Sequence, residues 1–221
     1  MPSLAFDHLV IGAATLEQGL DWAEEKLGVV LPPGGTHPRM GTHNRLTALG
    51  PASFLEIIAI DPDAAPPARP RLFALDDPAV RARLRQRPGL IAWVAATGDI
   101  AASLARAREA GADLGRAVEL TRSDLVWLLS IRDDGALPED GTLPALIQWP
   151  EGPHPAGRLT NQGLRLESLE LRHPEPAKLD RVLGAIGGDR LVRTVRADRP
   201  ALRAVLRSAD GARLELGEDG S

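Results

Sequence analysis

The chain has 221 residues, of which 43% are hydrophobic and 25% charged, and its formal net charge at pH 7 is −4. This is the composition of a globular protein with a sizeable core, and it offers no general attraction to nucleic acid or to an anionic membrane. No apolar run approaches the roughly 18 residues that a membrane-spanning helix needs. Because cysteine is absent, disulfides, thiolate metal ligands and cysteine nucleophiles are excluded. The chain opens on a strand-like run with no basic segment before it, so no secretory signal is expected and a cytoplasmic location is predicted.

The first sixty residues predict a strand, a helix and three further strands. A run rich in branched residues at 5–11 indicates the first strand. Thr15 then offers a helix N-cap with Gln18 at the capping-box spacing, apolar residues follow at helical intervals, and Gly28 ends the helix. The three remaining strands are expected at 29–31, 42–49 and 54–60.

The same order of elements recurs twice. Asp99 caps the predicted helix of the second unit and Gly111 ends it, while Pro176 lies in the first turn of the third helix and Gly187 follows it. Strands of the second unit are expected at 90–96, 118–121, 125–131 and 143–149. Strands of the third unit are expected at 164–171, 191–195, 201–206 and 213–216. We therefore predict an α+β protein built from three βαβββ units.

Several catalytic motifs are missing from the sequence. It contains no GxSxG, no P-loop, no GxGxxG after a strand and no HExxH. These absences disfavour a serine hydrolase, a nucleotide-driven machine and a zincin protease. No nucleotide or flavin cofactor is expected.

Two polar residues interrupt strands that otherwise read as fully buried. His8 lies in Asp-His-Leu-Val-Ile, and Glu56 lies in Phe-Leu-Glu-Ile-Ile. A buried carboxylate is costly unless it is paired or bound to a metal. One interpretation is a hydrogen-bonded His–Glu pair. The other is two ligands of a divalent metal, since imidazole and carboxylate suit Zn, Ni, Mn or Fe.

Four segments together carry a family resemblance. They are Asp7-His8-Leu9-Val10 before the Thr15-capped helix, Phe54-Leu55-Glu56-Ile57-Ile58, the segment His37 to Asn44, and Ile147-Gln148-Trp149 followed by His154-Pro155. With the βαβββ repeat, the first two resemble the vicinal oxygen chelate superfamily. The other two are similar to its glyoxalase-like domain branch. The resemblance covers roughly residues 4–185.

The resemblance implies a definite domain organisation. Residues 1–155 would form a glyoxalase-like domain in which units 4–60 and 89–149 pair and close into a cupped sheet. Residues 160–221 would form a third βαβββ-like unit that packs on this domain or on a partner chain. Since a third unit has no obvious partner within the chain, a homodimer is expected.

The resemblance also implies where a metal would bind, because each unit of such a cup offers one ligand on its first strand and one on its last. His8 and Glu56 occupy both positions of the first unit. In the second unit the positions fall near Ala92, which cannot bind metal, and Gln148, which can do so weakly. The implied metal ligands are therefore His8, Glu56 and Gln148, an incomplete set. Pairing of the first and third units would instead offer Glu215.

Further candidates lie on strands that would line the cup. His43 is a catalytic candidate beside Glu56, because its ordinary pKa suits proton transfer near neutral pH, although His43 and Asn44 could equally tie down a neighbouring loop. Asn44, Gln148 and Trp149 are the candidates for ligand binding. By strand alternation, only one of Gln148 and Trp149 should face the cup.

Three functions remain open from the sequence. The first is an enzyme acting on a small organic molecule, as a divalent-metal-dependent lyase, isomerase or dioxygenase. The second is a metal-free protein that binds or sequesters a small molecule without catalysis, which the Ala92 position favours. The third is an assembly role of the third unit. The expected partner is a small-molecule ligand rather than nucleic acid or a membrane.

Overall fold

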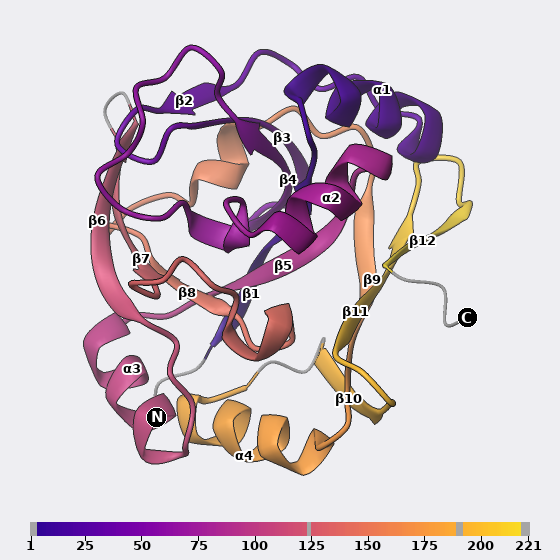
Figure 1. Ribbon diagram of the computed structural model, residues 1–221. Coiled ribbons are helices and arrows are strands. Elements are labelled where there is room, and N and C mark those ends of the chain that lie inside the picture. The colour runs from indigo at the N-terminus through magenta and orange to yellow at the C-terminus, as the bar shows by residue number, and fades with distance from the viewer. Residues whose placement is uncertain (1–3, 123–124, 189–191, 218–221) are drawn as a thin grey trace.

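The computed structural model describes residues 4–122, 125–188 and 192–217, whose strands form two sheets (Figure 1). The larger sheet has eight strands in the order β2-β3-β4-β1-β5-β8-β7-β6, and the smaller has four in the order β10-β9-β11-β12. Within the described residues, every helix is too short or too polar to cross a membrane. The predicted α+β class with a curved sheet is confirmed.

The first unit forms one half of the large sheet. Its elements are β1 (Ala5–Gly12), α1 (Leu16–Leu27), β2 (Gly35–His37), β3 (Thr42–Gly50) and β4 (Ser53–Ile60). β4 pairs with β1 in parallel and with β3 in antiparallel orientation. As predicted, the Thr15 hydroxyl accepts from the Gln18 amide, and Gly28 ends α1 in the left-handed region at a φ of 67°. The helix therefore begins and ends where its caps predict.

The predicted strand at 29–31 is wrong, because β2 begins only at Gly35. The Val29 amide donates to the Ala23 carbonyl at the end of α1, and both backbone polar groups of Val30 bond to the side chain of Gln162. Pro32 and Pro33 follow, and neither can donate a hydrogen bond to a neighbouring strand. The backbone groups of Val29 and Val30 therefore form hydrogen bonds outside the sheet, and no strand forms at 29–31.

The second unit forms the other half of the large sheet. Its elements are β5 (Gly89–Ala96), α3 (Ile100–Glu109), β6 (Arg116–Arg122), β7 (Leu125–Ile131) and β8 (Ala145–Gln148). β1 and β5 pair in antiparallel orientation and join the two halves. The first unit therefore pairs with the second rather than with the third. At the far side the edge strands β2 and β6 approach each other, so the sheet nearly closes into a cup (Figure 1).

Short helical segments connect these strands. They are η1 (Leu72–Ala74), α2 (Pro78–Gln86), η2 (Pro138–Gly141) and η3 (Pro155–Arg158). In α2 the carboxylate of Asp77 accepts from the amides of Ala79 and Val80 at 2.7 and 3.0 Å. Pro78 occupies the first turn, where a missing N–H costs nothing.

The third unit builds the small sheet. Its elements are β9 (Arg165–His173), α4 (Pro176–Ile186), β10 (Val192–Arg196), β11 (Ala201–Arg207) and β12 (Arg213–Gly217). The order of elements along the chain is βαβββ, but here the first strand pairs in parallel with the strand after the helix. In the first two units the first strand pairs in parallel with the last strand. Leu191, predicted as the start of a strand, lies outside the described residues.

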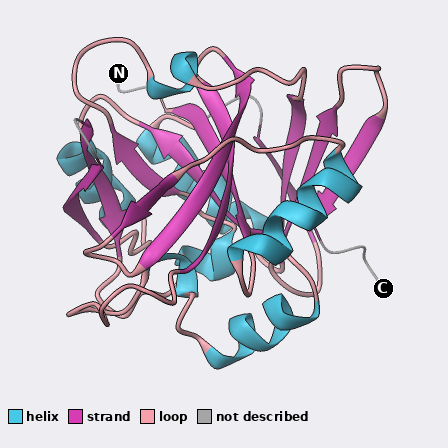
Figure 2. Ribbon diagram, turned by 90° about the horizontal axis from the view of Figure 1, so that it is seen from above, coloured by secondary structure: helices cyan, strands magenta, loops and turns pink. Residues whose placement is uncertain are grey.

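The small sheet packs on the outer face of the cup. Leu169, Leu171 and Leu202 of the third unit are buried in one cluster with Leu9 and Ile57 of the large sheet and with apolar residues of α1 and α3. A second cluster fills the opposite, inner face. Figure 2 shows the strands near the C-terminus as a separate group beside the curved sheet. The inner face is the one that carries the candidate site.

Candidate functional site

A β-bulge at Asp7 brings two consecutive side chains to the same side of β1. The register between β1 and β5 shifts between Phe6 and His8, which leaves Asp7 as the extra residue. Regular alternation would send Asp7 and His8 to opposite faces of the sheet. With the bulge, the Asp7 carboxylate contacts the His8 ring at 2.5 Å from Oδ1 to Nδ1. Bulges re-aim side chains in this way, often next to active sites.

Asp7 is the centre of a buried polar network. Its side chain is fully buried, and its Oδ2 accepts from Trp149 Nε1 at 2.7 Å and contacts His154 Nε2 at 2.9 Å. Burial raises the pKa of Asp7, but hydrogen bonds from His154, His8 and Trp149 outweigh it and lower the pKa to about 2. Asp7 is therefore an ionised carboxylate at neutral pH.

The ionised state of Asp7 fixes which nitrogens of its partners carry protons. A carboxylate can only accept hydrogen bonds, so His8 Nδ1 and His154 Nε2 must both donate to it. His154 Nδ1 in turn accepts from the amide of Ala156, so the His154 ring carries a proton on Nε2 alone and is neutral. His8 consequently presents its other nitrogen, Nε2, to the inside of the cup.

Glu56 faces His8 across this space. The separation between His8 Nε2 and Glu56 Oε2 is 3.6 Å, too long for a direct hydrogen bond. The second oxygen of Glu56 accepts from Asn44 Nδ2 at 2.6 Å. The Asn44 carbonyl oxygen accepts from the amide of Gly35 and from Arg122 Nη1, at 3.3 and 3.2 Å. The amide of Asn44 thus holds Glu56 in place and links it to Arg122 on β6.

These groups open onto a small cavity of about 50 Å³ inside the cup. The His8 ring stacks on Phe54, with ring centroids 4.3 Å apart and an interplanar angle of 14°. Further aromatic or apolar side chains complete the wall: Leu46, Leu72, Phe73, Leu120, Leu125, Trp127, Leu129, Ile147 and Trp149. A concave, mostly apolar space with a few converging polar groups is the usual form of a small-molecule site.

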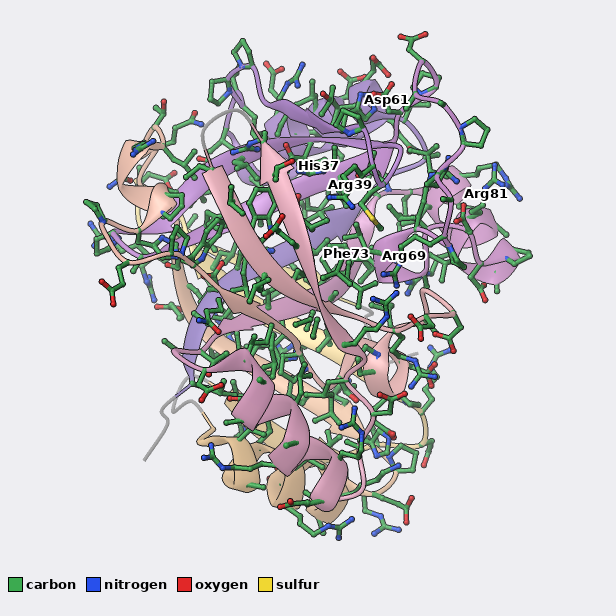
Figure 3. The ribbon with its side chains drawn as sticks, turned by 90° about the vertical axis from the view of Figure 1, so that its left-hand side faces the viewer. His37, Arg39, Asp61, Arg69, Phe73 and Arg81 are labelled. Atoms are coloured by element: carbon green, nitrogen blue, oxygen red, sulfur yellow. The ribbon has the colours of Figure 1, made fainter. Side chains whose placement is uncertain are left out.

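His37, the first residue of the segment that is similar to the glyoxalase-like domain branch, also lines this cavity. Burial lowers the pKa of His37, and its Nδ1 lies 3.1 Å from the hydroxyl of Thr42. Its ring meets Trp127 edge-on at 6.2 Å. Figure 3 shows His37 beside the β6–β7 hairpin, with Phe73 further along the same side of the molecule. His37 therefore adds a neutral imidazole to the aromatic wall.

The second unit contributes an apolar wall. Val94 pairs with His8 and Ala92 with Val10, and both belong to the inner cluster. Gln148 does not join His8 and Glu56, because its Oε1 accepts from the Ile100 amide at the start of α3 at 2.9 Å. Of the two neighbouring candidates, Trp149 is the one that lines the cavity.

This donor set does not fit a resident metal. Catalytic zinc sites use three protein ligands, and so does the facial triad that binds non-haem Fe(II). Here His8 Nε2 and Glu56 Oε2 face the cavity, whereas the facing positions of the second unit are aliphatic. Across residues 4–122, 125–188 and 192–217, no three His, Asp or Glu side chains gather as a metal site. The chemistry of the site is therefore derived from the protein groups alone.

Two other candidates lie away from the cavity. His43 lines pockets on the outer side of β3 rather than the inner cavity, and its Nε2 is buried without a hydrogen-bond partner among the described residues. Glu215 pairs with Arg203 and Arg213 on the third unit. Neither side chain contacts Glu56 or His8.

Two βαβββ units close into a cup, with His on the first strand and Glu on the last strand of one unit, and this arrangement agrees with the family model, which assigns the chain to the vicinal oxygen chelate superfamily. The family model of the glyoxalase-like domain matches residues 6–187, and the chain belongs to that family. The resemblance read from the sequence is thereby confirmed. No curated protein matches the chain.

Solved structures share the fold at low sequence identity. A hypothetical protein from Staphylococcus aureus is 15% identical with a TM-score of 0.66, over 96% of this chain and 98% of that one. A mutant of 4-hydroxymandelate synthase from Streptomyces coelicolor is 15% identical with a TM-score of 0.53, over 99% of this chain and 63% of that one. Methylmalonyl-CoA epimerase from Mycobacterium tuberculosis is 22% identical with a TM-score of 0.43, over 66% and 87%. At these identities the first two structures, with TM-scores of 0.66 and 0.53, show the fold alone.

Proposed function

We propose that the cup binds a small organic carbonyl compound and transfers a proton at the carbon next to its carbonyl group. The observation that carries this proposal is the facing pair of His8 Nε2 and Glu56 Oε2, 3.6 Å apart at the wall of an aromatic cavity. Each member of the pair is held from behind by its own partner, Asp7 for His8 and Asn44 for Glu56. Groups fixed in this way are suited to general acid–base catalysis.

The two groups have different roles in the proposed reaction. Glu56 Oε2 takes the proton from carbon, since the other oxygen is engaged by Asn44. Protonated His8 keeps its Nδ1–H on Asp7 and directs an Nε2–H towards the oxygen on which negative charge develops. The apolar wall excludes water and so strengthens both interactions. The enol or enolate formed in this way is an intermediate, which the same groups can reprotonate at carbon in an isomerase reaction.

Exchange of hydrogen for solvent deuterium tests the proposal. We expect deuterium from heavy water to enter at least one of pyruvate, 2-oxobutanoate, acetoacetate and hydroxyacetone faster than in buffer, as followed by proton NMR. Glu56→Gln and His8→Gln should each lower that rate by about 10²- to 10⁴-fold. Glu17→Gln, which removes an exposed carboxylate on α1, should leave it unchanged. Exchange at the buffer rate with the whole panel, or full exchange in Glu56→Gln, would contradict the proposal.

Binding without reaction is the second candidate, favoured by the aliphatic wall that the second unit presents opposite His8. In that case His8, Asn44 and Glu56, which line the cavity, would only orient a ligand by hydrogen bonds. Calorimetry combined with the deuterium experiment separates the two functions. A sequestering protein binds its ligand in calorimetry, and the ligand released from it carries no deuterium.

A metal-dependent lyase, isomerase or dioxygenase is the third candidate, and it rests on the positions of His8 and Glu56 in the family fold. These two residues could both touch one divalent ion, since their facing atoms are 3.6 Å apart. The Gln148 ligand proposed for that ion would have to leave the amide of Ile100. We favour the protein-only reaction because it requires no such rearrangement.

The expected homodimer stays a prediction. It was inferred from a third unit without a partner, and the structure buries Leu169, Leu171 and Leu206 of that unit against the same chain. Light scattering at micromolar concentration decides it, because a dimer mass supports the prediction and a monomer mass contradicts it.

A further inference from the structure

A second, larger pocket lies outside the cup, at the seam where β2 and β6 approach each other. This outer pocket has a volume of about 740 Å³ and is lined mainly by residues 32–36 and Pro38, together with His43, Arg45, Thr121 and Arg122. Within residues 4–122, 125–188 and 192–217, its lining contains two arginines and one histidine but no aspartate or glutamate. A pocket lined in this way attracts an anion.

Arg122 connects the outer pocket to the inner cavity, because its side chain lines both. Its Nη1 donates to the carbonyl oxygen of Asn44, the same amide that holds Glu56. Among the residues that the structure describes, the partner of this guanidinium is thus a neutral amide rather than a carboxylate. Arg122 therefore keeps its positive charge and further donors for a ligand.

The backbone of β2 is shaped to let Arg122 reach this position. A Cβ atom at Gly35 would lie 2.4 Å from the Cδ of Arg122. A Cβ atom at Gly34 would lie 1.9 Å from the backbone carbonyl oxygen of Asn44. Any other residue at either position would push the guanidinium or β3 away. The two glycines thus leave room for a charged side chain to cross the seam.

His43 adds a further polar group to the wall of the outer pocket. Its Nε2 is buried and lacks a hydrogen-bond partner among the described residues. Arg45 lies two residues further along β3, with Nη1 donating to the backbone carbonyl of Asn44 at 3.2 Å. Both side chains line the same pocket as Arg122.

We propose that the outer pocket binds the carboxylate or phosphate group of the molecule that reacts in the inner cavity, with Arg122 contacting that group at the junction. This inference rests on the proposed function for the reacting end of the molecule. It assigns the substrate to the organic anions, with a carbonyl end next to His8 and Glu56. The anionic end stays at the seam, where Arg45 and His43 also face it.

Binding of a matched set of probes tests this assignment without any reaction. Phenylacetate, phenylphosphonate and the neutral phenylacetamide are titrated into the full chain and followed by the amide NMR signals. We expect at least one anion to bind about tenfold or more tightly than the amide, since one charge-assisted contact is worth that factor. The tighter of the two anions distinguishes a carboxylate from a phosphate ligand.

Variants distinguish a specific contact with Arg122 from a general effect of the protein's positive charges on anion binding. Arg122→Gln should remove the preference for the anion, whereas Arg81→Gln, on α2 and outside the outer pocket, should keep it (Figure 3). Gly35→Ala should reduce the preference with every arginine in place, and Gly98→Ala, whose Cβ would meet no atom within 4 Å, should not.

Two outcomes would overturn the inference: an equal affinity for anion and amide up to about 10 mM probe, or an undiminished preference in Arg122→Gln. The Glu56→Gln variant is titrated in parallel, because it tests the proton transfer and not the outer pocket. If wild type shows no deuterium exchange, while wild type and Glu56→Gln both prefer the anion, this inference stands and the proposed reaction is rejected.

Discussion

Asp7 determines which nitrogen of His8 faces the cavity. It is buried, accepts from three side chains and holds the Nδ1 side of the ring. Strand alternation gave no reason to place Asp7 in the cup, because the sequence does not show where a bulge falls. The available signal was a carboxylate directly before a histidine in an otherwise apolar strand, which is costly to bury without partners.

The pKa of Asp7 predicts how stability depends on pH. Its pKa is about 2 in the folded chain, against 3.8 as the ordinary value, so the folded state gains about 2 kcal/mol above pH 4. This gain is lost as the pH falls through the folded pKa. We expect Asp7→Asn to lower the free energy of unfolding at neutral pH and the difference from wild type to shrink between about pH 4 and pH 2.

Urea unfolding over this pH range measures the difference. A constant difference at all pH values would mean that Asp7 contributes through packing rather than through its charge. Wild type alone would not suffice, because Asp134 also has a pKa lowered to about 2, through hydrogen bonds from Arg132 and the Ala136 amide.

His43 provides a second prediction at the scale of the residue. Its side chain lines the outer pocket and not the inner cavity, so it cannot reach a carbon held between His8 and Glu56. At saturating substrate, His43→Gln should therefore leave the deuterium exchange rate within about twofold of wild type, where loss of a general acid or base costs about 10²-fold or more. A drop comparable to that of Glu56→Gln would place His43 in the reaction.

Most of the inner site could be predicted from single residues. His8, Glu56, Asn44 and Trp149 all line the cavity, and each stood out as a polar or large side chain within a strand. Gln148 was indistinguishable from Trp149 by sequence, because alternation requires one of the two to face outward without saying which. In the structure Gln148 accepts a hydrogen bond from the amide of Ile100 at the start of α3, so Trp149 is the residue that lines the cavity.

At the scale of elements, helix caps and strand runs were predicted well, and strand order was not. The first two units pair with each other as expected, whereas the position of β9 between β10 and β11 in the third unit had no counterpart in the sequence. Both arrangements satisfy the same local pattern of apolar residues, so the pattern cannot choose between them. The choice depends on contacts between the third unit and the outer face of the cup, which are remote in sequence.

The close approach of α1 to β4 predicts a contrast between two glycines in helices. A Cβ at Gly19 would lie 2.5 Å from Cγ2 of Ile57, whereas a Cβ at Gly184 in α4 would meet no atom within 4 Å. We expect Gly19→Ala to lower the free energy of unfolding by about 1–3 kcal/mol through overpacking. Gly184→Ala should raise it by about 0.5–1 kcal/mol through helix propensity.

Thermal or urea unfolding followed by circular dichroism compares the two variants with wild type. Equal shifts in the same direction would show that the helix backbone, rather than the contact with Ile57, sets the effect of Gly19.

At the scale of the whole molecule, the shared outer core predicts that the third unit and the cup unfold together. All four tryptophans, Trp22, Trp93, Trp127 and Trp149, precede the third unit. Trp22 packs against the outer core that the cup shares with the third unit, so the fluorescence of a Trp22→Phe variant reports on the cup, and far-ultraviolet circular dichroism reports on the entire chain. We expect the two urea transitions to coincide. A circular dichroism phase with no fluorescence change would show that residues 160–221 form an independent domain.

The central claim is that the first unit supplies the reacting groups and the second unit an apolar wall, so that the cup works with protein groups alone. The most direct test is metal content by inductively coupled plasma mass spectrometry, on protein without a histidine tag. Wild type and a His8→Ala, Glu56→Ala double variant are first incubated with Zn, Ni, Mn and Fe, then freed of loosely bound ions. The account predicts the same low metal content in both proteins. Near-stoichiometric metal in wild type that disappears in the double variant would contradict it.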